Sequence, residues 1–355
     1  MSELSQENER LHVTSYKLFF QEFLFHVLPI ITLLLVVGFV SAYIQYGFIP
    51  NGDLPFPIAD VRVPLWHIFW MGLWTGYIMA LVGEASGILA LPYSMSVLQF
   101  TNPAVSPTTQ IITFLNPIGA LLGFHRNGQW NFEFAKWVCV GGVIGGLIGP
   151  YLRVTVFVNT RPFQFLMGLA LATVGVYMLH SIVSIKKIPT HQKFLNKGLR
   201  IKTISLSRGT LIIGYGEDSW KLSTVFLFLI GSGVGVISSA LGVGGGFLLV
   251  PIFVTYFRIP IFVVVAATIP YVIVLSAIGL FSYSFLLPKI GLSAINPEWS
   301  WGFIAGAGGV LGSWIASKTQ HSVPEHFLKF ILGSITLSAG FFYIANYLLE
   351  LQSKL

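Results

Sequence analysis

Charged side chains are scarce in this chain. Lys, Arg, Asp and Glu together make up 9% of its residues, while hydrophobic residues reach 54%; soluble globular domains carry about 25% charged residues. An ordinary soluble core cannot bury this many apolar residues. The composition therefore predicts a protein that crosses a membrane several times. The single cysteine, Cys139, excludes an internal disulfide framework.

Enzyme signatures are also missing. The sequence has no His-Glu-x-x-His motif, no Gly-x-Ser-x-Gly motif and no paired Cys/His spacing for a metal. We therefore expect no enzyme activity, no catalytic residue, no metal site and no cofactor. The net charge of +7 is typical of some nucleic-acid binders, but the basic residues gather in one connecting segment. No nucleic-acid partner is expected, because that segment fits a membrane loop better.

Long apolar runs occupy most of the chain. About 20 residues are needed to cross a bilayer, and nine runs approach or exceed this length: 24–46, 65–82, 105–124, 134–152, 161–183, 223–241, 262–286, 299–317 and 326–348. The tail at 1–23 begins with polar and acidic residues and lacks the basic start of a signal peptide. We expect 24–46 to remain as an extra N-terminal transmembrane helix. The predicted fold is an all-α polytopic membrane protein with about nine full spans.

Two glycine-rich breaks interrupt this pattern. Four glycines fall within five positions of an otherwise apolar stretch: Gly242, Gly244, Gly245 and Gly246. Each costs a helix about 1 kcal/mol relative to alanine, so a continuous helix is not expected there. Backbone freed from a helix inside a membrane must be buried in protein or line a water-filled cavity. Transporters commonly build their substrate sites from such broken helices.

A weaker copy of the break occurs at 83–92, and it belongs to a longer internal repeat. A shift of 159 positions places Gly76 on Gly235 and Pro92 on Pro251, and a shift of 163 places Gly145 on Gly308. The matched order indicates duplication, with one repeat at 65–183 and a second at 223–348. The short apolar run after each break has the length of a half-helix or re-entrant segment. Whether the repeats are parallel or inverted stays open at this point.

The segment that joins the repeats, 184–222, is strongly basic. It carries eight basic residues against two acidic ones: Lys186, Lys187, Lys193, Lys197, Arg200, Lys202, Arg208 and Lys221, with Glu217 and Asp218. Short loops rich in Lys and Arg remain in the cytoplasm, so we expect a cytoplasmic connector in a multi-pass plasma-membrane protein, the inner membrane if the source is bacterial. Binding of anionic lipid or of a partner protein is a second interpretation of the same charges.

The glycine run at 242–251, its weaker copy at 83–92, the duplicated helices and the basic connector together resemble the TauE/SafE family of membrane permeases, often described as sulfite exporters. The resemblance extends from about 65 to 348, with 24–46 as an addition. It implies transport of small anions such as sulfite, thiosulfate or organosulfonates. Glu84 departs from the family pattern, which usually has a small or apolar residue there.

The glycine runs also predict an anion site on physical grounds. Successive glycine N–H groups ahead of a helix form an anion-binding concavity, and the helix dipole adds partial positive charge. Glycines that merely let helices approach closely are the alternative. The expected substrate-binding residues surround both breaks: Gly83, Glu84, Ser86, Gly87, Thr109, Gln110, Gly242, Gly244, Gly245, Gly246 and Thr268. Thr108 and Asn116 are further candidates, and Arg153 is expected to reach toward the membrane interface.

Glu84 is also the candidate coupling residue. A carboxyl at membrane depth is costly and is a functional candidate by default, so protonation of Glu84 would couple transport to a proton gradient. A water-facing carboxylate at a helix end is the alternative. The expected function is secondary transport driven by a proton or sodium gradient, with the lipid bilayer and a small anion as partners. An uncoupled anion channel and a membrane scaffold or sensor are the rival functions, and the sequence does not set the oligomeric state.

Overall fold

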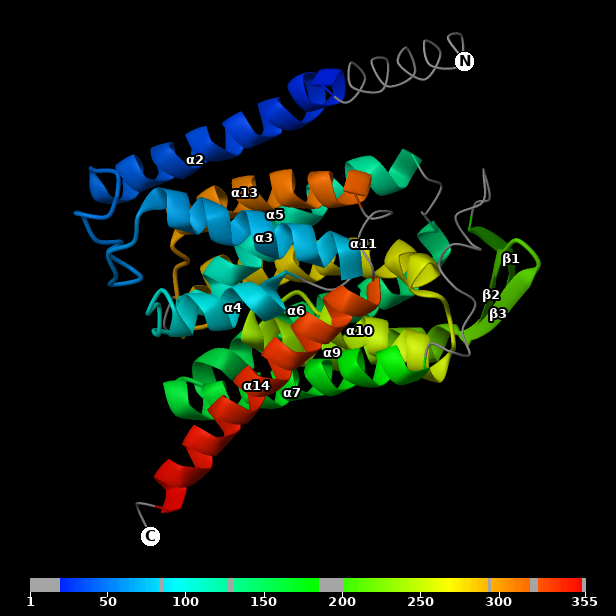
Figure 1. The fold of residues 1–355 in the computed structure, drawn as a ribbon. Helices are drawn as coiled ribbons and strands as arrows, with labels where there is room; N and C mark the ends of the chain where they lie inside the picture. The colour runs from blue at the N-terminus through cyan, green and yellow to red at the C-terminus, as the bar shows by residue number, and fades with distance from the viewer. Residues whose placement is uncertain are drawn as a thin grey trace.

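The protein, seen in a computed structural model, is a bundle of long helices with a small β-sheet at one end (Figure 1). The structure describes residues 20–82, 86–126, 131–184, 201–207, 209–292, 295–319 and 325–352. Gly83 and Glu84, together with the tail 1–19 and positions 185–200 of the connector, lie outside the described residues.

The first half of the chain is helical apart from its connections. Its elements are η1 (Phe23–Val27, a π-helical turn), α2 (Leu28–Tyr46), α3 (Leu65–Val82), α4 (Gly87–Ser96), α5 (Val105–Arg126), α6 (Phe132–Thr155) and α7 (Thr160–Ser184). Local chemistry fixes several of the ends. Gly47, with φ of 76°, ends α2 in the left-handed conformation that glycine adopts readily. The side chain of Asn131 caps α6 by accepting a 2.9 Å hydrogen bond from the backbone N–H of Phe134.

The second half follows the same order after the sheet. Its elements are α9 (Thr224–Leu241), α10 (Gly246–Pro251), η3 (Ile252–Tyr256), α11 (Ile261–Phe281), η4 (Ser282–Leu286), α12 (Leu287–Lys289), α13 (Trp299–Thr319) and α14 (Glu325–Gln352). The hydroxyl of Ser223 caps α9 by accepting from Phe226 N–H at 3.4 Å. Each range expected to span the membrane is covered by a long described helix.

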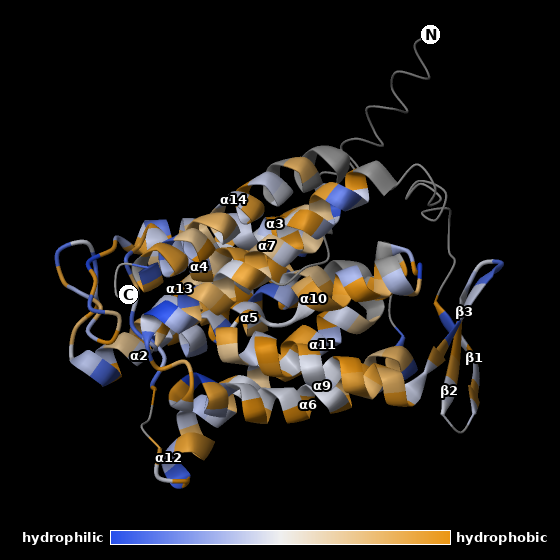
Figure 2. Cartoon of the chain, turned by 90° about the horizontal axis from the view of Figure 1, so that it is seen from below, coloured by the Kyte–Doolittle hydropathy of each residue, from blue (hydrophilic) through white to orange (hydrophobic). Residues whose placement is uncertain are grey.

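The helices have the composition of membrane spans. Five of them are long and apolar enough to cross a bilayer: Phe20–Tyr46, Phe132–Thr155, Thr160–Ile182, Thr224–Leu241 and Ala267–Lys289. Large apolar side chains face outward, such as Phe25, 74% exposed, and Ile44, 79% exposed. Figure 2 shows hydrophobic residues along the helices and many hydrophilic ones at the ends of the bundle. These features are those of a mostly helical, polytopic membrane protein.

Glycines let the helices pack at backbone distance. α3 packs along α13, α6 packs along α9, and α7 packs along α14. A Cβ atom added to Gly76 would lie 2.4 Å from the carbonyl oxygen of Gly309, and one added to Gly145 would lie 2.5 Å from Cα of Gly235. Any larger residue at these positions would push the paired helices apart.

The connector contains a sheet that is an exception to the expected all-α fold. Strands β1 (Lys202–Ser207), β2 (Thr210–Tyr215) and β3 (Asp218–Ser223) form an antiparallel sheet in the order β1-β2-β3. Leu211, Ile213 and Leu222 of the sheet are buried in one apolar cluster with Phe134 and Phe253. The sheet therefore covers the end of the bundle where α6 begins and η3 ends. It lies at the opposite end from segment 47–64 (Figures 1 and 2).

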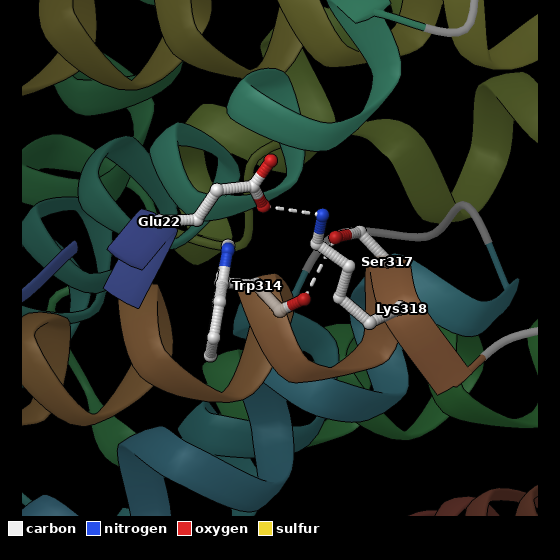
Figure 3. Close-up of polar contacts among 4 residues, drawn as sticks. All are labelled: Glu22, Trp314, Ser317 and Lys318. Carbon is white, nitrogen blue, oxygen red and sulfur yellow. Dashed lines mark hydrogen bonds and ion pairs between the residues drawn. The ribbon is translucent and has the colours of Figure 1, made fainter. Parts of the chain in front are cut away.

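The N-terminal helix α2 packs along α13 and is fastened to it near both ends. Near its start, Glu22 forms a 2.5 Å ion pair with Lys318 (Figure 3). Phe23 lies against Trp314, with ring centroids 5.6 Å apart. At its other end, the hydroxyl of Tyr46 donates to Glu298, just before α13.

Candidate functional site

Both expected breaks separate a long helix from a short one. Positions 242–245 separate α9 from α10, and positions 83–86 separate α3 from α4. Gly242, Gly244 and Gly245 have φ values of 83°, 80° and 79°. Only glycine adopts this left-handed region without a steric cost. The sequence therefore forces the chain out of the helix at Gly242 and allows α10 to begin after Gly245.

The start of α4 contacts the second break inside the bundle. A Cβ atom added to Gly87, at the start of α4, would lie 2.6 Å from Cα of Val243 and 2.5 Å from Cγ2 of Thr113. A Cβ atom added to Gly242 would lie 2.2 Å from the carbonyl oxygen of Ser106. The start of α4, the first residues of α5 and the break at 242–245 thus form one tightly packed unit. Within it, α4 begins against the residues that precede α10.

Unused backbone donors gather at this junction. Among the described residues, no acceptor bonds the N–H groups of Gly244, Gly245 or Gly246, and the first helical bonds of α10 run from Leu248 and Leu249 to the carbonyl of Gly245. Free N–H groups and the aligned peptide dipoles make the start of a helix electropositive. The helical run continues from α10 through η3. The geometry is that of an anion-binding concavity.

Buried polar side chains near the breaks also lack partners. Four oxygen atoms have no hydrogen bond among the described residues: Ser86 Oγ, Gln110 Oε1, Ser238 Oγ and Thr268 Oγ1. Their residues are at most 1% exposed. The hydroxyl of Ser238 would be 3.2 Å from a Cβ on Gly245, and Ser86 precedes α4 without capping it. Nearly all buried polar groups in proteins are hydrogen-bonded, so these oxygens indicate a place for a polar ligand or water.

The other predicted residues are placed differently. Thr109 Oγ1 donates to the carbonyl of Val105 at 2.8 Å, so its hydroxyl serves its own helix. Thr108 likewise donates to Ala104, at 2.7 Å. Gln110 reaches α9, where Nε2 donates to Ser239 Oγ at 3.0 Å. Thr268 lies on α11, which packs against α10. The side chain of Asn116 is buried and unpartnered, but it lies against Gly309 of α13.

Arg153 does not reach toward the membrane interface, contrary to the sequence expectation. It is 1% exposed. Its Nε donates to Ser106 Oγ at 3.2 Å, its Nη1 donates to the carbonyl of Phe157, and its guanidinium lies 3.9 Å from the ring centroid of Phe163. Because Arg153 lies near the end of an apolar run, the sequence suggested a side chain at the membrane interface. Only the fold shows that other residues cover this end of α6.

Glu298 is also a buried charged residue. Unlike Arg153, it was not singled out from the sequence. Its carboxylate accepts from Tyr46 Oη at 2.7 Å, from Ser300 Oγ at 3.0 Å, and from two backbone N–H groups of segment 47–64. Burial raises the pKa of Glu298 above its ordinary value, and these hydrogen bonds partly offset the effect. Glu298 joins α2, segment 47–64 and α13, so its contacts indicate a structural role. The described residues hold no cluster of His, Cys, Asp and Glu suited to a metal.

A bundle of apolar helices in which one short helix begins against the glycine break that precedes another has features of a membrane transporter. The chain belongs to the sulfite exporter TauE/SafE family, whose model matches residues 68–343. This match confirms the resemblance seen in the sequence. It begins after α2, so the N-terminal helix lies outside the matched region.

Two relatives from Xylella fastidiosa, strains Temecula1 and 9a5c, are each described as a probable membrane transporter protein. Each is 23% identical to this chain over 272 residues, which is 76% of this chain and 90% of the relative. No solved structure matches the chain. The family and the relatives' names indicate a multi-pass membrane transporter rather than an enzyme.

Proposed function

We propose that this protein is a secondary transporter that carries small sulfur-containing anions, such as sulfite, thiosulfate or an organosulfonate. The observation that carries the proposal is the contact of Gly87 with Val243, which brings the start of α4 against the break before α10. The amides of Gly244 and Gly245 in that break have no acceptor among the described residues. Such a junction attracts anions without a buried lysine. The sulfur-containing class is taken from the family description.

Support for an internal duplication comes from a helix contact that occurs twice. A Cβ on Gly308 would lie 2.1 Å from the carbonyl oxygen of Phe69, and a Cβ on Gly141 would lie 2.2 Å from that of Phe228. The two phenylalanines are 159 positions apart (69 to 228), the shift found in the sequence. The two glycines are 167 apart (141 to 308), one helical turn more than the shift of 163. This similarity supports the proposal that the α3–α13 and α9–α6 interfaces arose as two copies of one interface.

Support for an inverted duplication comes from helix direction. α3 begins after segment 47–64 and α9 begins after the sheet, and these lie at opposite ends of the bundle (Figure 1). The two helices therefore run in opposite senses. In the proposed topology, α4 and α10 are re-entrant segments that enter from opposite sides. Nine helices then cross fully: α2, α3, α5, α6, α7, α9, α11, α13 and α14.

The proposed mechanism is alternating access. Ser86, Ser238 and Thr268 are at most 1% exposed, so an anion reaches the junction only when the halves move apart. Movement of one repeat against the other would open each side in turn. The basic connector supports a cytoplasmic position for the sheet under the positive-inside rule, and the plasma membrane is the proposed location. Glu84 stays the proposed proton-coupling residue, with sodium coupling as the alternative.

Counterflow in proteoliposomes tests the function. Vesicles with the full-length protein are loaded with unlabelled thiosulfate and diluted into a trace of radiolabelled thiosulfate. A carrier exchanges the two, so label accumulates transiently above its equilibrium level. Protein-free vesicles and vesicles loaded with gluconate are the controls, and both should show no overshoot.

The other outcomes are equally informative. Label that enters without an overshoot identifies an uncoupled channel and overturns the carrier. No uptake of thiosulfate, sulfite or methanesulfonate overturns the transport of sulfur-containing anions. Competition by unlabelled sulfite, methanesulfonate and acetate then ranks the substrates.

A further inference from the structure

We propose that Arg153 binds the transported anion directly and forms a cationic subsite next to the glycine junction. This inference rests on the proposed anion transport, and it identifies a charge that the family match does not assign. The ligand is an oxyanion with at least two oxygens, such as thiosulfate, sulfite or a sulfonate.

The first reason is that Arg153 is a buried cation with no carboxylate partner among the described residues. It is 1% exposed, and no described residue forms an ion pair with it. A charge taken out of water costs several kcal/mol unless it is paired. Charged residues inside membrane proteins are rare and usually mark substrate or ion pathways. A mobile anion would supply the missing charge during each transport cycle.

The second reason is that part of the guanidinium is unused. Arginine has five N–H donors. Nε bonds Ser106 Oγ and Nη1 bonds the carbonyl of Phe157, while Nη2 has no acceptor among the described residues. Phe163 lies against the face of the guanidinium, 3.9 Å from its ring centroid. Because Phe163 covers this face of the guanidinium, its N–H edge remains available to a ligand. That edge suits two oxygens of one anion.

The third reason is that Arg153 is linked to the junction through Ser106. The hydroxyl of Ser106 accepts from Arg153, while its backbone packs against Gly242. From the other side, Tyr283 Oη donates to the carbonyl oxygens of Ser239 and Ala240, at 3.4 and 3.3 Å. Ser239 and Ala240 lie in the last turn of α9, just before the break. The guanidinium is therefore linked to Gly242 through Ser106, and an anion that moves from the junction toward Arg153 exchanges one set of donors for another.

A purely structural role for Arg153 would be to bond the carbonyl of Phe157 and close the end of α6. The two roles differ in how they depend on ligand charge. A residue that only holds the fold in place affects all ligands alike. A residue that touches the anion favours divalent thiosulfate over monovalent methanesulfonate, because its Coulomb interaction scales with ligand charge.

The experiment measures Kd for thiosulfate and for methanesulfonate by calorimetry on the detergent-purified full-length protein. Arg153→Gln should weaken thiosulfate binding more than tenfold and methanesulfonate binding clearly less. Arg153→Lys keeps the charge but loses the planar fork, so thiosulfate binding should weaken about three- to tenfold. Arg62→Gln, which removes a charge from an exposed position in segment 47–64, is the matched control and should bind like the wild type.

The outcomes separate the two proposals. A wild-type protein that binds neither anion overturns the proposed function itself. A wild type that binds thiosulfate, with folded Arg153 variants that bind equally well or lose both anions in the same proportion, overturns the Arg153 subsite alone. If Arg153→Gln does not fold, Arg153→Lys decides the matter, and unchanged thiosulfate affinity in that variant overturns the proposal.

Discussion

The hydroxyl of Tyr46, the last residue of α2, donates a 2.7 Å hydrogen bond to the buried carboxylate of Glu298, 252 positions further along the chain. This contact joins the N-terminal helix, which lies outside the family match, to the residue just before α13. The Glu22–Lys318 ion pair secures the other end of α2 but is partly exposed. Surface ion pairs contribute little, so the Tyr46–Glu298 bond is the stronger of the two attachments.

Replacing Tyr46 by Phe should destabilise the protein by about 1.5–3 kcal/mol, because it removes a hydrogen bond to a buried charged group. The measurement is the denaturant-induced unfolding of the detergent-purified protein. Tyr43→Phe is the control, because Tyr43 is 66% exposed on the same helix. Equal stability of the two variants would show that α2 does not depend on Glu298.

Glu298 should make stability depend on pH. Burial raises its pKa in the folded protein above the value in the unfolded chain. The folded state therefore holds the proton more tightly, and stability falls as pH rises from the unfolded pKa through the folded one. In Glu298→Gln that part of the slope should vanish. Thermal unfolding of both proteins between pH 4 and 8 measures the difference, and parallel curves would contradict it.

Replacing Gly245 by Ala should weaken thiosulfate binding more than tenfold. The substitution forces alanine into a positive φ of 79° and places its Cβ 2.7 Å from the ring of Tyr271. The backbone conformation alone costs about 1–2 kcal/mol. Gly47→Ala is the matched control, since Gly47 has a φ of 76° and open space around it. Calorimetry should show loss of binding in the first variant only; equal Kd values would remove the glycine amides from the site.

The hydroxyls of Ser86 and Ser238, which have no partner among the described residues, should serve the ligand rather than the fold. Removing a buried hydroxyl that has no partner does not destabilise a protein, and can stabilise it by up to about 1 kcal/mol. Ser86→Ala and Ser238→Ala should therefore unfold at the same or higher temperature, yet bind thiosulfate about fivefold more weakly. Ser181→Ala is the control, because its hydroxyl already bonds the carbonyl of Met178. Lower stability with unchanged affinity would assign both serines to the fold.

Glu84→Gln should flatten the pH dependence of thiosulfate counterflow and abolish accumulation driven by a pH gradient. The variant removes the proton from the cycle while leaving the glycine amides and Arg153 in place. Counterflow at saturating thiosulfate should persist, because exchange requires no net proton movement. A pH profile that matches the wild type would instead support the alternative, in which Glu84 is a water-facing carboxylate.

Some of the site could be predicted from the sequence because its cause is local. Consecutive glycines break a helix wherever they occur, so the break at 242–246 follows from residue order alone, and the break at 83–87 follows from its match to that run in the internal repeat. The partners of the breaks could not be predicted in this way, because the contact of Gly87 with Val243 depends on how two distant helix pairs cross. Residue type and position alone also did not predict the role of Thr109. It is a hydroxyl residue in the expected place, but its hydroxyl bonds the backbone of its own helix.

The sequence by itself determined that this chain crosses a membrane, where its helices break, and which family it belongs to. Composition, run length and glycine spacing are properties of the chain that need no folded partner. Only the tertiary structure decided that α4 begins against the break at 242–245, that Arg153 is buried instead of exposed, and that Glu298 joins three segments. Each of these depends on residues far apart in sequence, which become neighbours only when glycine-lined helices pack at backbone distance.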